Sequence, residues 1–312
     1  MKKIVIATRG SKLALWQANH IKESLSSLDK NLEIELKILV TRGDKVQDRP
    51  LALIGGKGLF TKEIDEAMLR GEAQVAVHSM KDLPVVLPEE LQLCAFTKTE
   101  DSRDALLSEK YDGLDALPQG ATVGTTSLRR RMNLYAVRPD LNIVELRGNV
   151  DTRIRKLKEG QFDAIVLAAA GINRLGLSSS VQYFSPVDIV SSIPSMGQGA
   201  LALQTIKDPF VIDLVSQLND KNSMMEVTIE RDFVAKLEGG CQVPIGISAS
   251  VLGDGNISIQ AIVGLPDGTE LLQETTSVKE SDYNTAGELL ADKMIARGAK
   301  ELLAKASAIA YK

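Results

Sequence analysis

The chain has 312 residues, and its 37 Lys and Arg residues against 41 Asp and Glu residues give a formal net charge of −4. Hydrophobic residues make up 44% and charged residues 25%, which is typical of folded globular proteins and excludes a disordered chain. No apolar run reaches the roughly 18 residues of a membrane span, and the length suggests about two or three domains. The slightly acidic total excludes a general attraction to nucleic acid or to anionic membranes.

The N-terminal sequence MKKIVIATRG places two lysines before an apolar run, as a signal peptide does. The run ends after about four residues, at Thr8, whereas a signal peptide needs roughly 7–15 apolar residues. We therefore expect a first β-strand and a cytoplasmic protein. Only Cys94 and Cys241 occur, which favours a reducing compartment over a disulfide scaffold, and with His20 and His78 they give no zinc-ligand spacing.

Strands and helices alternate along the first part of the chain. Residues 3–7 read as a strand, and Ser11 is a helix cap before apolar residues at helical spacing up to Leu28. Alternating apolar residues predict a strand over 32–40. A helix over about 61–70 and a short buried strand over 75–77 follow. This rhythm predicts an α/β layer with a largely parallel sheet.

The same rhythm restarts near Ala121 and predicts a second α/β unit. Its expected elements are a strand over 121–125, a helix from Ser127, a strand over 142–146, a helix over 150–159 and a strand within 162–171 leading to a further helix. A strand over 200–205 follows the turn MGQG, and we expect it to return the chain to the first unit.

The last third has a different pattern. Ser223 and Glu226 match a capping box, so a helix is expected to start there. Three strands near 245–252, 257–263 and 270–277 are separated by turn sequences, and a closing helix is expected over about 284–305. Consecutive strands joined by tight turns predict an antiparallel sheet with helices, an α+β domain.

The expected fold class is therefore α/β, with two α/β domains and a smaller α+β C-terminal domain. Domain 1 would comprise 1–98 and about 197–217, domain 2 residues 99–196, and domain 3 residues 218–312.

Positive charge is concentrated in residues 125–158, which hold nine basic and three acidic residues, a local charge of +6. Arg129 and Arg130 fall in the first turn of a predicted helix, where cations oppose the helix dipole. An anion bound there would resolve this conflict. Arg147 follows a strand end, where open α/β sheets bind ligands.

Three interpretations of this stretch remain open from the residues alone. Arginine suits bidentate recognition of carboxylate or phosphate, which favours a small polyanionic ligand. A solvated basic face is the alternative, and a nucleic-acid surface is a third. The aromatic content of 4% argues against base stacking.

Three further segments carry candidate chemistry. Gly55–Gly58 contains Lys57 but lacks the phosphate-loop pattern, so we interpret it as a hinge or lid with one cation. Lys81 and Asp82 in HSMKDLP follow a buried strand and form either a proton-handling pair or a structural ion pair. Cys241 in GGCQVP lies on a glycine-rich loop, where a thiol is either a nucleophile or incidental.

Nine segments together resemble one family. ATRGSKLALWQ, VTRGD, GGKGLFTKE, AVHSMKDLP, VGTTSLRR, LRGNVDTR, LAAAGINRLG, GQGAL and LEGGCQVPIG occur in this order and cover nearly the whole chain. They are similar to the porphobilinogen deaminases, also called hydroxymethylbilane synthases. The resemblance implies two domains like the lobes of periplasmic binding proteins and a third domain that carries the cysteine.

The resemblance also implies a reaction and a cofactor. Such enzymes deaminate four porphobilinogen molecules and join them head to tail into the linear tetrapyrrole hydroxymethylbilane, in haem biosynthesis. The primer is a dipyrromethane cofactor bound through a thioether, here to Cys241. Porphobilinogen would be the small-molecule partner of a monomeric protein that engages neither nucleic acid nor membrane.

By the same resemblance, site residues fall into three groups, and no metal ligand is among them. Asp82 matches the catalytic acid, which stabilises the cationic azafulvene formed as ammonia leaves. The cofactor carboxylates would be held by Lys81, Thr125, Thr126, Ser127, Arg129 and Arg130, with Asp82 near the pyrrole nitrogens. Substrate rings would be bound by Arg9, Ser11, Gln17, Lys57, Arg147, Arg153, Arg174 and Gln198.

Overall fold

The computed structural model describes residues 2–45, 58–239 and 243–310. The chain divides into two compact units. Unit 1 contains residues 1–100 and 200–224, and unit 2 contains residues 101–199 and 225–312. The strand expected over 200–205 therefore does return the chain to the first unit.

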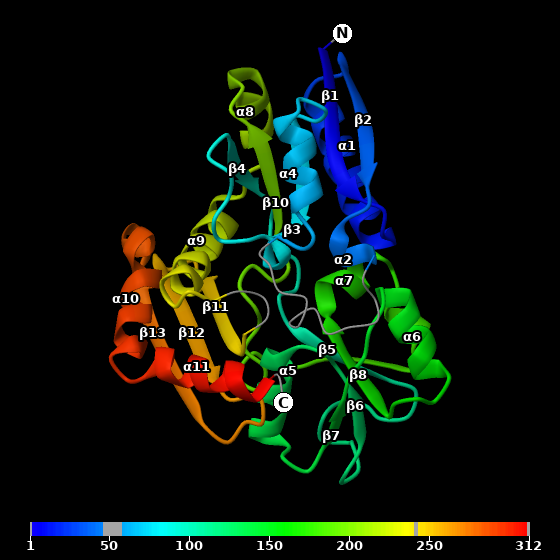
Figure 1. Cartoon of the computed structure of the whole chain (residues 1–312), viewed down its shortest axis with the longest axis vertical. Helices are drawn as coiled ribbons and strands as arrows, with labels where there is room; N and C mark the ends of the chain where they lie inside the picture. Colours follow the sequence, from blue (N-terminus) through cyan, green and yellow to red (C-terminus); the bar gives the residue numbers. More distant parts are fainter. Residues whose placement is uncertain (1, 46–57, 240–242, 311–312) are drawn as a thin grey trace. The chain divides into compact units, whose positions relative to one another are not determined.

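Unit 1 is built on one mixed five-stranded sheet (Figure 1). In spatial order its strands are β2 (Leu32–Leu39), β1 (Lys2–Arg9), β3 (Val75–Ser79), β10 (Leu201–Ile206) and β4 (Leu91–Phe96). β2, β1 and β3 run parallel, and β10 is antiparallel to both β3 and β4. The carboxyl ends of β1 and β3 therefore lie next to each other.

Helices cover the sheet of unit 1 because their apolar residues recur at helical spacing. Ala18, Ile21 and Leu25 of α1 (Lys12–Leu28) are fully buried against the strands. Ile64 and Met68 of α4 (Lys62–Leu69) pack in a second cluster with residues of β1 and β3. The described residues of this unit also form α2 (Arg42–Lys45), the 3₁₀ turn η1 (Met80–Asp82) and α8 (Pro209–Ser216).

Unit 2 contains a second five-stranded sheet with the same pattern of parallel and antiparallel neighbours, but its antiparallel inner strand comes first in the chain of this unit, not last. Its strands in spatial order are β7 (Asn142–Val144), β6 (Thr122–Gly124), β8 (Ala164–Ala168), β5 (Asp104–Ser108) and β9 (Tyr183–Pro186). β6 pairs in parallel with β7 and β8, while β5 is antiparallel to β8 and β9. Its helices are α5 (Leu128–Val137), α6 (Val150–Lys158), α7 (Ala169–Arg174) and the 3₁₀ turn η2 (Ser178–Ser180).

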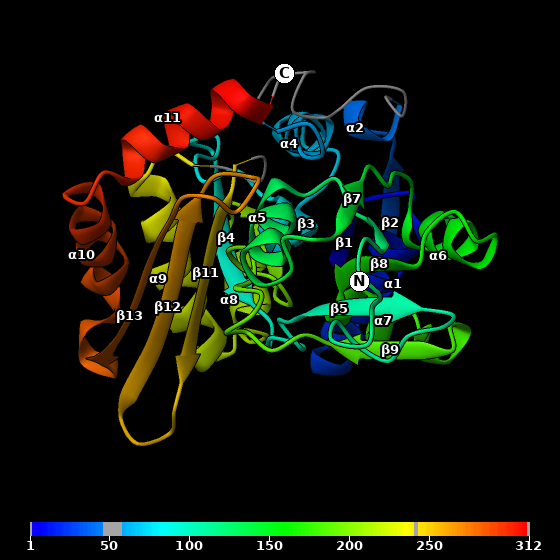
Figure 2. The same ribbon diagram turned by 90° about the horizontal axis from the view of Figure 1, so that it is seen from below.

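The rest of unit 2 is an antiparallel sheet with helices beside it (Figure 2). β11 (Ile245–Val251), β12 (Asn256–Gly264) and β13 (Leu271–Lys279) pair in sequence order. A buried cluster of Met132, Ile193 and Ile262 joins this sheet to the α5 side of the unit. The expected fold class, two α/β sheets and a smaller α+β part, is confirmed. The division into three domains stays a prediction.

The capping-box prediction at Ser223 is wrong. Helix α9 (Lys221–Lys236) begins two residues earlier, and the Asp220 carboxylate accepts the Ser223 N–H at 2.8 Å as its cap. The Ser223 hydroxyl accepts the Thr99 N–H instead, at 2.8 Å. Glu226 accepts the N–H of Val251 rather than returning to the helix start.

The single closing helix expected over 284–305 is two helices, α10 (Tyr283–Ile295) and α11 (Ala299–Ala310), after the 3₁₀ turn η3 (Glu280–Asp282). Gly298 separates them with φ +95°, a left-handed conformation that ends a helix and favours glycine.

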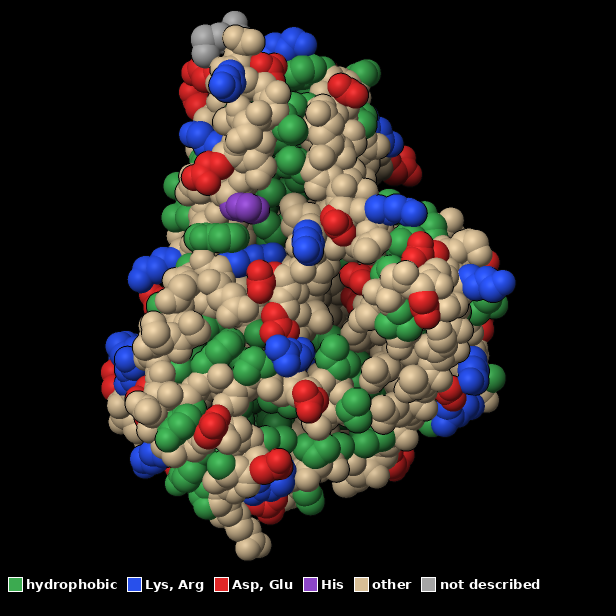
Figure 3. Space-filling view, turned by 180° about the vertical axis from the view of Figure 1, so that it is seen from behind, with side chains coloured by type: hydrophobic (Ala, Val, Ile, Leu, Met, Phe, Trp, Pro, Cys, Tyr) green, Lys and Arg blue, Asp and Glu red, His purple; other side chains and the backbone are tan. Residues whose placement is uncertain are grey.

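Side-chain charge is mixed at the surface. On the face seen in Figure 3, Lys and Arg side chains are interspersed with Asp and Glu side chains. Across the described ranges, no helix is both long enough and apolar enough to span a membrane.

Candidate active site

A pocket in unit 1 lies at the carboxyl ends of β1 and β3. Its polar lining from β1 and α1 comprises Arg9, Ser11 and Gln17. Its lining from β3 and the turn that follows includes His78 and Asp82. These residues are about 60–80 positions apart in the chain, and the parallel pairing of β1 with β3 brings them to one edge of the sheet. Four predicted site residues thus share one cavity.

Local geometry fixes the α1 side of this pocket. Ser11 is the N-cap of α1, and its hydroxyl accepts the Ala14 N–H at 3.3 Å, as the sequence predicts. Gln17 is 2% exposed and donates from Nε2 to the Ser79 hydroxyl at 2.8 Å. This bond ties α1 to the end of β3.

Asp82 is held by a short turn after β3. In η1 the Leu83 N–H bonds the Met80 carbonyl, and the Met80 N–H bonds the Ala200 carbonyl at 3.0 Å. The Met80 side chain is fully buried, which anchors the turn. Lys81 lies in the same turn and is half-buried. The backbone thus presents the half-buried Asp82 carboxylate at the pocket.

Arg9 brings a positive charge to the pocket. Its guanidinium forms an ion pair with Asp44 and lies 4.2 Å from the centre of the Phe60 ring. Burial raises the pKa of Asp44, but the hydrogen bonds from Arg9 and Thr41 outweigh it and hold that pKa below its ordinary value. A ligand carboxylate at Arg9 would therefore share the guanidinium with an ionised Asp44.

His78 is a pocket residue that sequence reasoning used only in a zinc-spacing test. Its Nε2 lies 2.9 Å from the Gln204 Oε1, and the Gln204 Nε2 donates to Asp65 at 2.9 Å. With the amide oriented in this way, the His78 Nε2 carries the proton. Burial lowers the pKa of His78 to about 4, so the ring is neutral at physiological pH.

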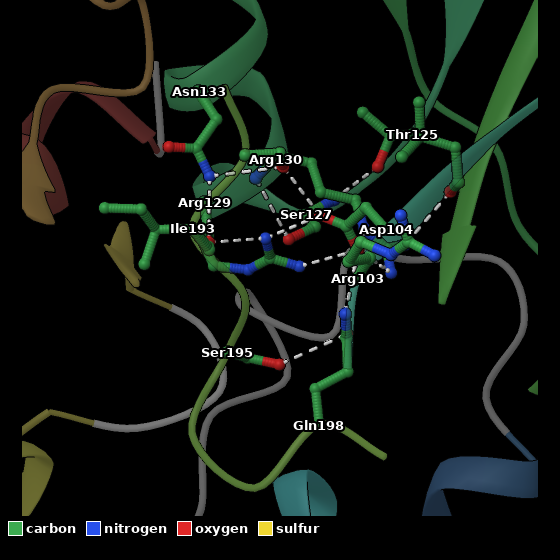
Figure 4. A network of polar contacts seen from close by, with 12 residues as sticks. Arg103, Asp104, Thr125, Ser127, Arg129, Arg130, Asn133, Ile193, Ser195 and Gln198 are labelled. Carbon is green, nitrogen blue, oxygen red and sulfur yellow. Dashed lines mark hydrogen bonds and ion pairs between the residues drawn. The ribbon is translucent and has the colours of Figure 1, made fainter. Parts of the chain in front are cut away.

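In unit 2, Arg129 and Arg130 surround one buried carboxylate, that of Asp104 (Figure 4). Arg129 donates to its two oxygens at 2.6 and 3.1 Å, and Arg130 donates to Oδ1 from Nε at 2.9 Å. Asp104 is fully buried, and the arginines are 4% and 7% exposed. The three side chains together carry a net charge of +1.

Neutral side chains complete this cluster. The Ser192 hydroxyl donates to Asp104 at 2.8 Å, and the Gln198 Nε2 donates to it at 3.1 Å. Burial raises the pKa of Asp104, but the charges of Arg129 and Arg130 reverse the shift and hold that pKa far below its ordinary range. The carboxylate is therefore ionised at any physiological pH.

Sequence reasoning missed Asp104. It placed an anion near Arg129 and Arg130 because cations oppose the helix dipole there, and an anion is present, but it belongs to the chain. The available signal was an acidic residue opening the apolar strand Asp104–Ser108, whose residues are all buried. A buried aspartate needs a cationic partner.

The loop before α5 is ordered by its own hydroxyls. The helix expected from Ser127 is present, and Ser127 is the N-cap of α5, whose side chain accepts the Arg130 N–H at 3.4 Å. Thr125 is buried, and its hydroxyl accepts the Ser127 N–H at 3.2 Å. The Thr126 hydroxyl lies 3.5 Å from the Leu146 carbonyl.

The other predicted arginines of unit 2 are partly bound to the backbone. Arg153 donates to the Gly148 carbonyl and Arg174 to the Gly199 carbonyl, both at 2.7 Å. Arg147 pairs loosely with Glu145 at 3.7 Å. Lys57 and Cys241 lie outside the described residues.

Comparison with known proteins gives two family matches. The model described as "Porphobilinogen deaminase, dipyromethane cofactor binding domain" matches residues 4–212. The model described as "Porphobilinogen deaminase, C-terminal domain" matches residues 224–296. Together they cover most of the chain.

Curated relatives agree over nearly the full length. The chain is 59% identical to the porphobilinogen deaminase of Sulfurimonas denitrificans over 309 residues, covering 99% of each chain. It is 58% identical to that of Nitratiruptor sp., again covering 99% of each chain. Among solved structures, the substrate-binding domain of a putative molybdenum transporter from Clostridium difficile is similar at 9% identity and a TM-score of 0.44, over 72% of this chain and 94% of that one.

Proposed function

The chain belongs to the porphobilinogen deaminase family, and on this premise we propose that porphobilinogen reacts in the pocket of unit 1, with Asp82 as the catalytic residue. The enzyme deaminates four porphobilinogen molecules and joins them head to tail into the linear tetrapyrrole hydroxymethylbilane, in tetrapyrrole and haem biosynthesis. Its cofactor is dipyrromethane.

The observation that carries the proposal is the composition of this pocket. A carboxylate, Asp82, and a guanidinium, Arg9, line one cavity with the polar groups of Ser11 and Gln17. A pyrrole with acetate and propionate substituents offers an N–H donor and two carboxylates. The carboxylate suits the pyrrole N–H, and the guanidinium suits the substituents by bidentate hydrogen bonding.

The arginine cluster of unit 2 fits a cofactor rich in carboxylates. Its charge of +1 is buried with Asp104, and Arg129 Nε makes no hydrogen bond within the described part of the chain. A bound carboxylate would neutralise the remaining positive charge and accept a hydrogen bond from Arg129 Nε. When bound, dipyrromethane supplies the primer to which the first substrate ring is joined.

In the mechanism, Asp82 acts on charge and on protons. As ammonia leaves the aminomethyl group of porphobilinogen, the electron pair of the breaking C–N bond departs with nitrogen, and the pyrrole becomes cationic. The Asp82 carboxylate accepts the pyrrole N–H and stabilises this cation. When the new C–C bond forms, Asp82 accepts the proton displaced from the attacking ring carbon.

The other site residues bind and orient. We assign the carboxylates of substrate rings to basic and polar side chains, which are those of Arg9, Ser11, Gln17, Lys57, Arg147, Arg153, Arg174 and Gln198. We assign the cofactor carboxylates to Lys81, Thr125, Thr126, Ser127, Arg129 and Arg130. Cys241 is proposed as the attachment point because its thiol can form a thioether.

The wider organisation is also a proposal. We propose a cytoplasmic monomer in three domains, the third of which, residues 218–312, carries Cys241. A slightly acidic net charge of −4 supports a protein that binds neither nucleic acid nor membrane.

Intact mass and ammonia release test these assignments. The purified protein should exceed its chain mass by two pyrrole units and should release ammonia from porphobilinogen. Cys241→Ser should abolish the adduct. Cys94→Ser is the matched control, because burial raises the pKa of Cys94 and its thiol donates to the Ile212 carbonyl, so the adduct should remain.

Asp82→Asn tests the catalytic residue. The amide keeps the size of the side chain but removes the negative charge, so the adduct should form while turnover falls by about 10²-fold or more. Normal turnover in this variant would reject the assignment of Asp82.

A further inference from the structure

The turn that carries Gln198 is fixed by side chains from several elements. Gln198 donates to Asp104, and the Gly199 carbonyl accepts from Arg174 Nη2 at 2.7 Å. Gly197 and Gly199 have φ of +65° and +96°, so the backbone follows a path that other residues rarely adopt. The turn thus connects two proposed substrate-binding side chains to the arginine cluster.

A buried glutamate fixes the first residue of this turn. Glu230, on α9, accepts the Gly197 N–H on Oε2 at 2.6 Å. Its other oxygen accepts the N–H of Ala249, on β11, at 2.8 Å. Glu230 is 7% exposed, so both bonds are shielded from water. One carboxyl group therefore joins α9, β11 and the turn.

The bonding of Glu230 is unusual for a buried acid. Within the described ranges, no Lys or Arg forms an ion pair with it, and both known partners are backbone N–H groups. A buried carboxyl without a cation is costly, but an apolar side chain here would leave the N–H groups of Gly197 and Ala249 without an acceptor. Packing alone therefore does not account for a glutamate at this position.

The two segments that Glu230 joins to the turn are those that flank Cys241 in the chain. α9 ends at Lys236, five residues before Cys241, and β11 begins at Ile245, four residues after it. A displacement of either segment relative to the turn would change the position of the cysteine relative to Gln198.

We propose that Glu230 is a positioning residue for the reaction: it holds the Gly197–Gly199 turn against the two segments that flank Cys241, and so sets Gln198 and Arg174 in register with the cofactor. The inference rests on the proposed function, because it takes Cys241 as the attachment point and both other residues as substrate ligands.

The test compares matched leucine variants. Glu230→Leu keeps the side-chain volume but removes both acceptors. Glu226→Leu is the control, because Glu226 lies one turn earlier on α9 and accepts the N–H of Val251 on the same strand at 3.0 Å. For both variants we would measure the intact mass, kcat and KM for porphobilinogen, the melting temperature, and hydrogen exchange in a peptide containing Gly197.

Glu230→Leu should load its cofactor, exchange the Gly197 amide faster and raise KM by about tenfold, as misplacement of a binding group does. Glu226→Leu should leave KM and this exchange within twofold of the unmodified protein. Glu230→Gln keeps one acceptor and should give an intermediate KM. If Glu230→Leu does not fold, Glu230→Gln against Glu226→Gln carries the same comparison.

Two outcomes overturn the inference. One is an unchanged KM in a Glu230 variant that folds and carries its cofactor. The other is an equal rise in KM in both leucine variants, which would indicate general destabilisation of α9. Failure of the unmodified protein to carry dipyrromethane on Cys241 would instead reject the proposed function, so the two failures are distinguishable.

Discussion

Replacing Asp104 with Asn should destabilise the protein strongly. The substitution removes the one negative charge between Arg129 and Arg130, whose side chains are 4% and 8% exposed. Two buried guanidinium groups then remain with a net charge of +2. Removing one partner of a buried ionic cluster typically costs about 3–5 kcal/mol. For units of this size that corresponds to a fall in melting temperature of roughly 10 °C.

Chemical denaturation followed by far-ultraviolet circular dichroism measures this effect. The control is Asp101→Asn, three residues earlier in the chain. Asp101 also pairs with an arginine, Arg103, but their side chains are 22% and 38% exposed. A pair that accessible is worth at most about 1 kcal/mol, so the control should be nearly neutral.

A loss of less than about 1 kcal/mol in Asp104→Asn would refute the reasoning, since the cluster would then not depend on its central charge. Equal losses in both variants would refute it as well, because burial would then not distinguish the two pairs. Binding of a carboxylate-rich cofactor should partly restore stability to Asp104→Asn, by mass action on the folded state.

Three other changes test the structure. The pKa of His78 in the folded protein, about 4, lies below its ordinary value of 6.5. The free energy of unfolding should therefore be at its full value above pH 6.5 and fall by about 3 kcal/mol as the pH drops to 4. In denaturant titrations, His78→Phe should remove this pH dependence and His20→Asn should retain it. Gly287→Ala places a Cβ 2.2 Å from the Ile229 carbonyl oxygen and should lower the free energy of unfolding by about 1–3 kcal/mol in thermal unfolding. An unchanged stability would mean that α9, which carries Ile229, and α10, which carries Gly287, move apart readily. Asp220→Ala should cost about 1 kcal/mol by removing the cap of α9, and an unchanged unfolding midpoint would contradict that cap.

Local sequence signals predicted most elements because their physics is local. Ser11 was identified as a helix cap and a helix was expected from Ser127, and both side chains accept the backbone N–H three residues ahead. Ser223 and Glu226 match a capping box, yet Asp220 is the cap. Asp220 lies three residues before Ser223, and its carboxylate accepts the Ser223 N–H. Which of the two residues caps the helix depends on Thr99, because the Thr99 N–H donates to the Ser223 hydroxyl. A contact across 124 positions cannot be read from a short window.

The interior of the candidate site was harder to predict because it depends on sheet order. Asp104 precedes Arg129 by 25 residues, and its strand is the first of unit 2 in the chain. That strand inserts between β8 and β9 rather than next to β6. No strand was predicted over 104–108, and a local pattern would not have given the neighbours of that strand. The arginines were therefore found and the carboxylate between them was not.

The shared topology of the two α/β sheets explains why the candidate residues collect where they do. Three strands of each sheet run parallel, β2–β1–β3 in unit 1 and β7–β6–β8 in unit 2. The central strand of each set, β1 or β6, comes first in the chain. The chain then forms the neighbour on one side, β2 or β7, and afterwards the neighbour on the other side, β3 or β8. The connections from β1 and β3 therefore diverge at the carboxyl ends of these strands, where the pocket of unit 1 lies, and those from β6 and β8 diverge in the same way.

Ser11 and Asp82 follow β1 and β3, while Ser127 and Arg174 follow β6 and β8. The same divergence of connections thus occurs in both units, although no internal repeat is evident in the sequence. Strand order, and not similarity of sequence, fixes these positions. A substitution that alters strand order should therefore remove binding in its unit even when every proposed ligand residue is retained.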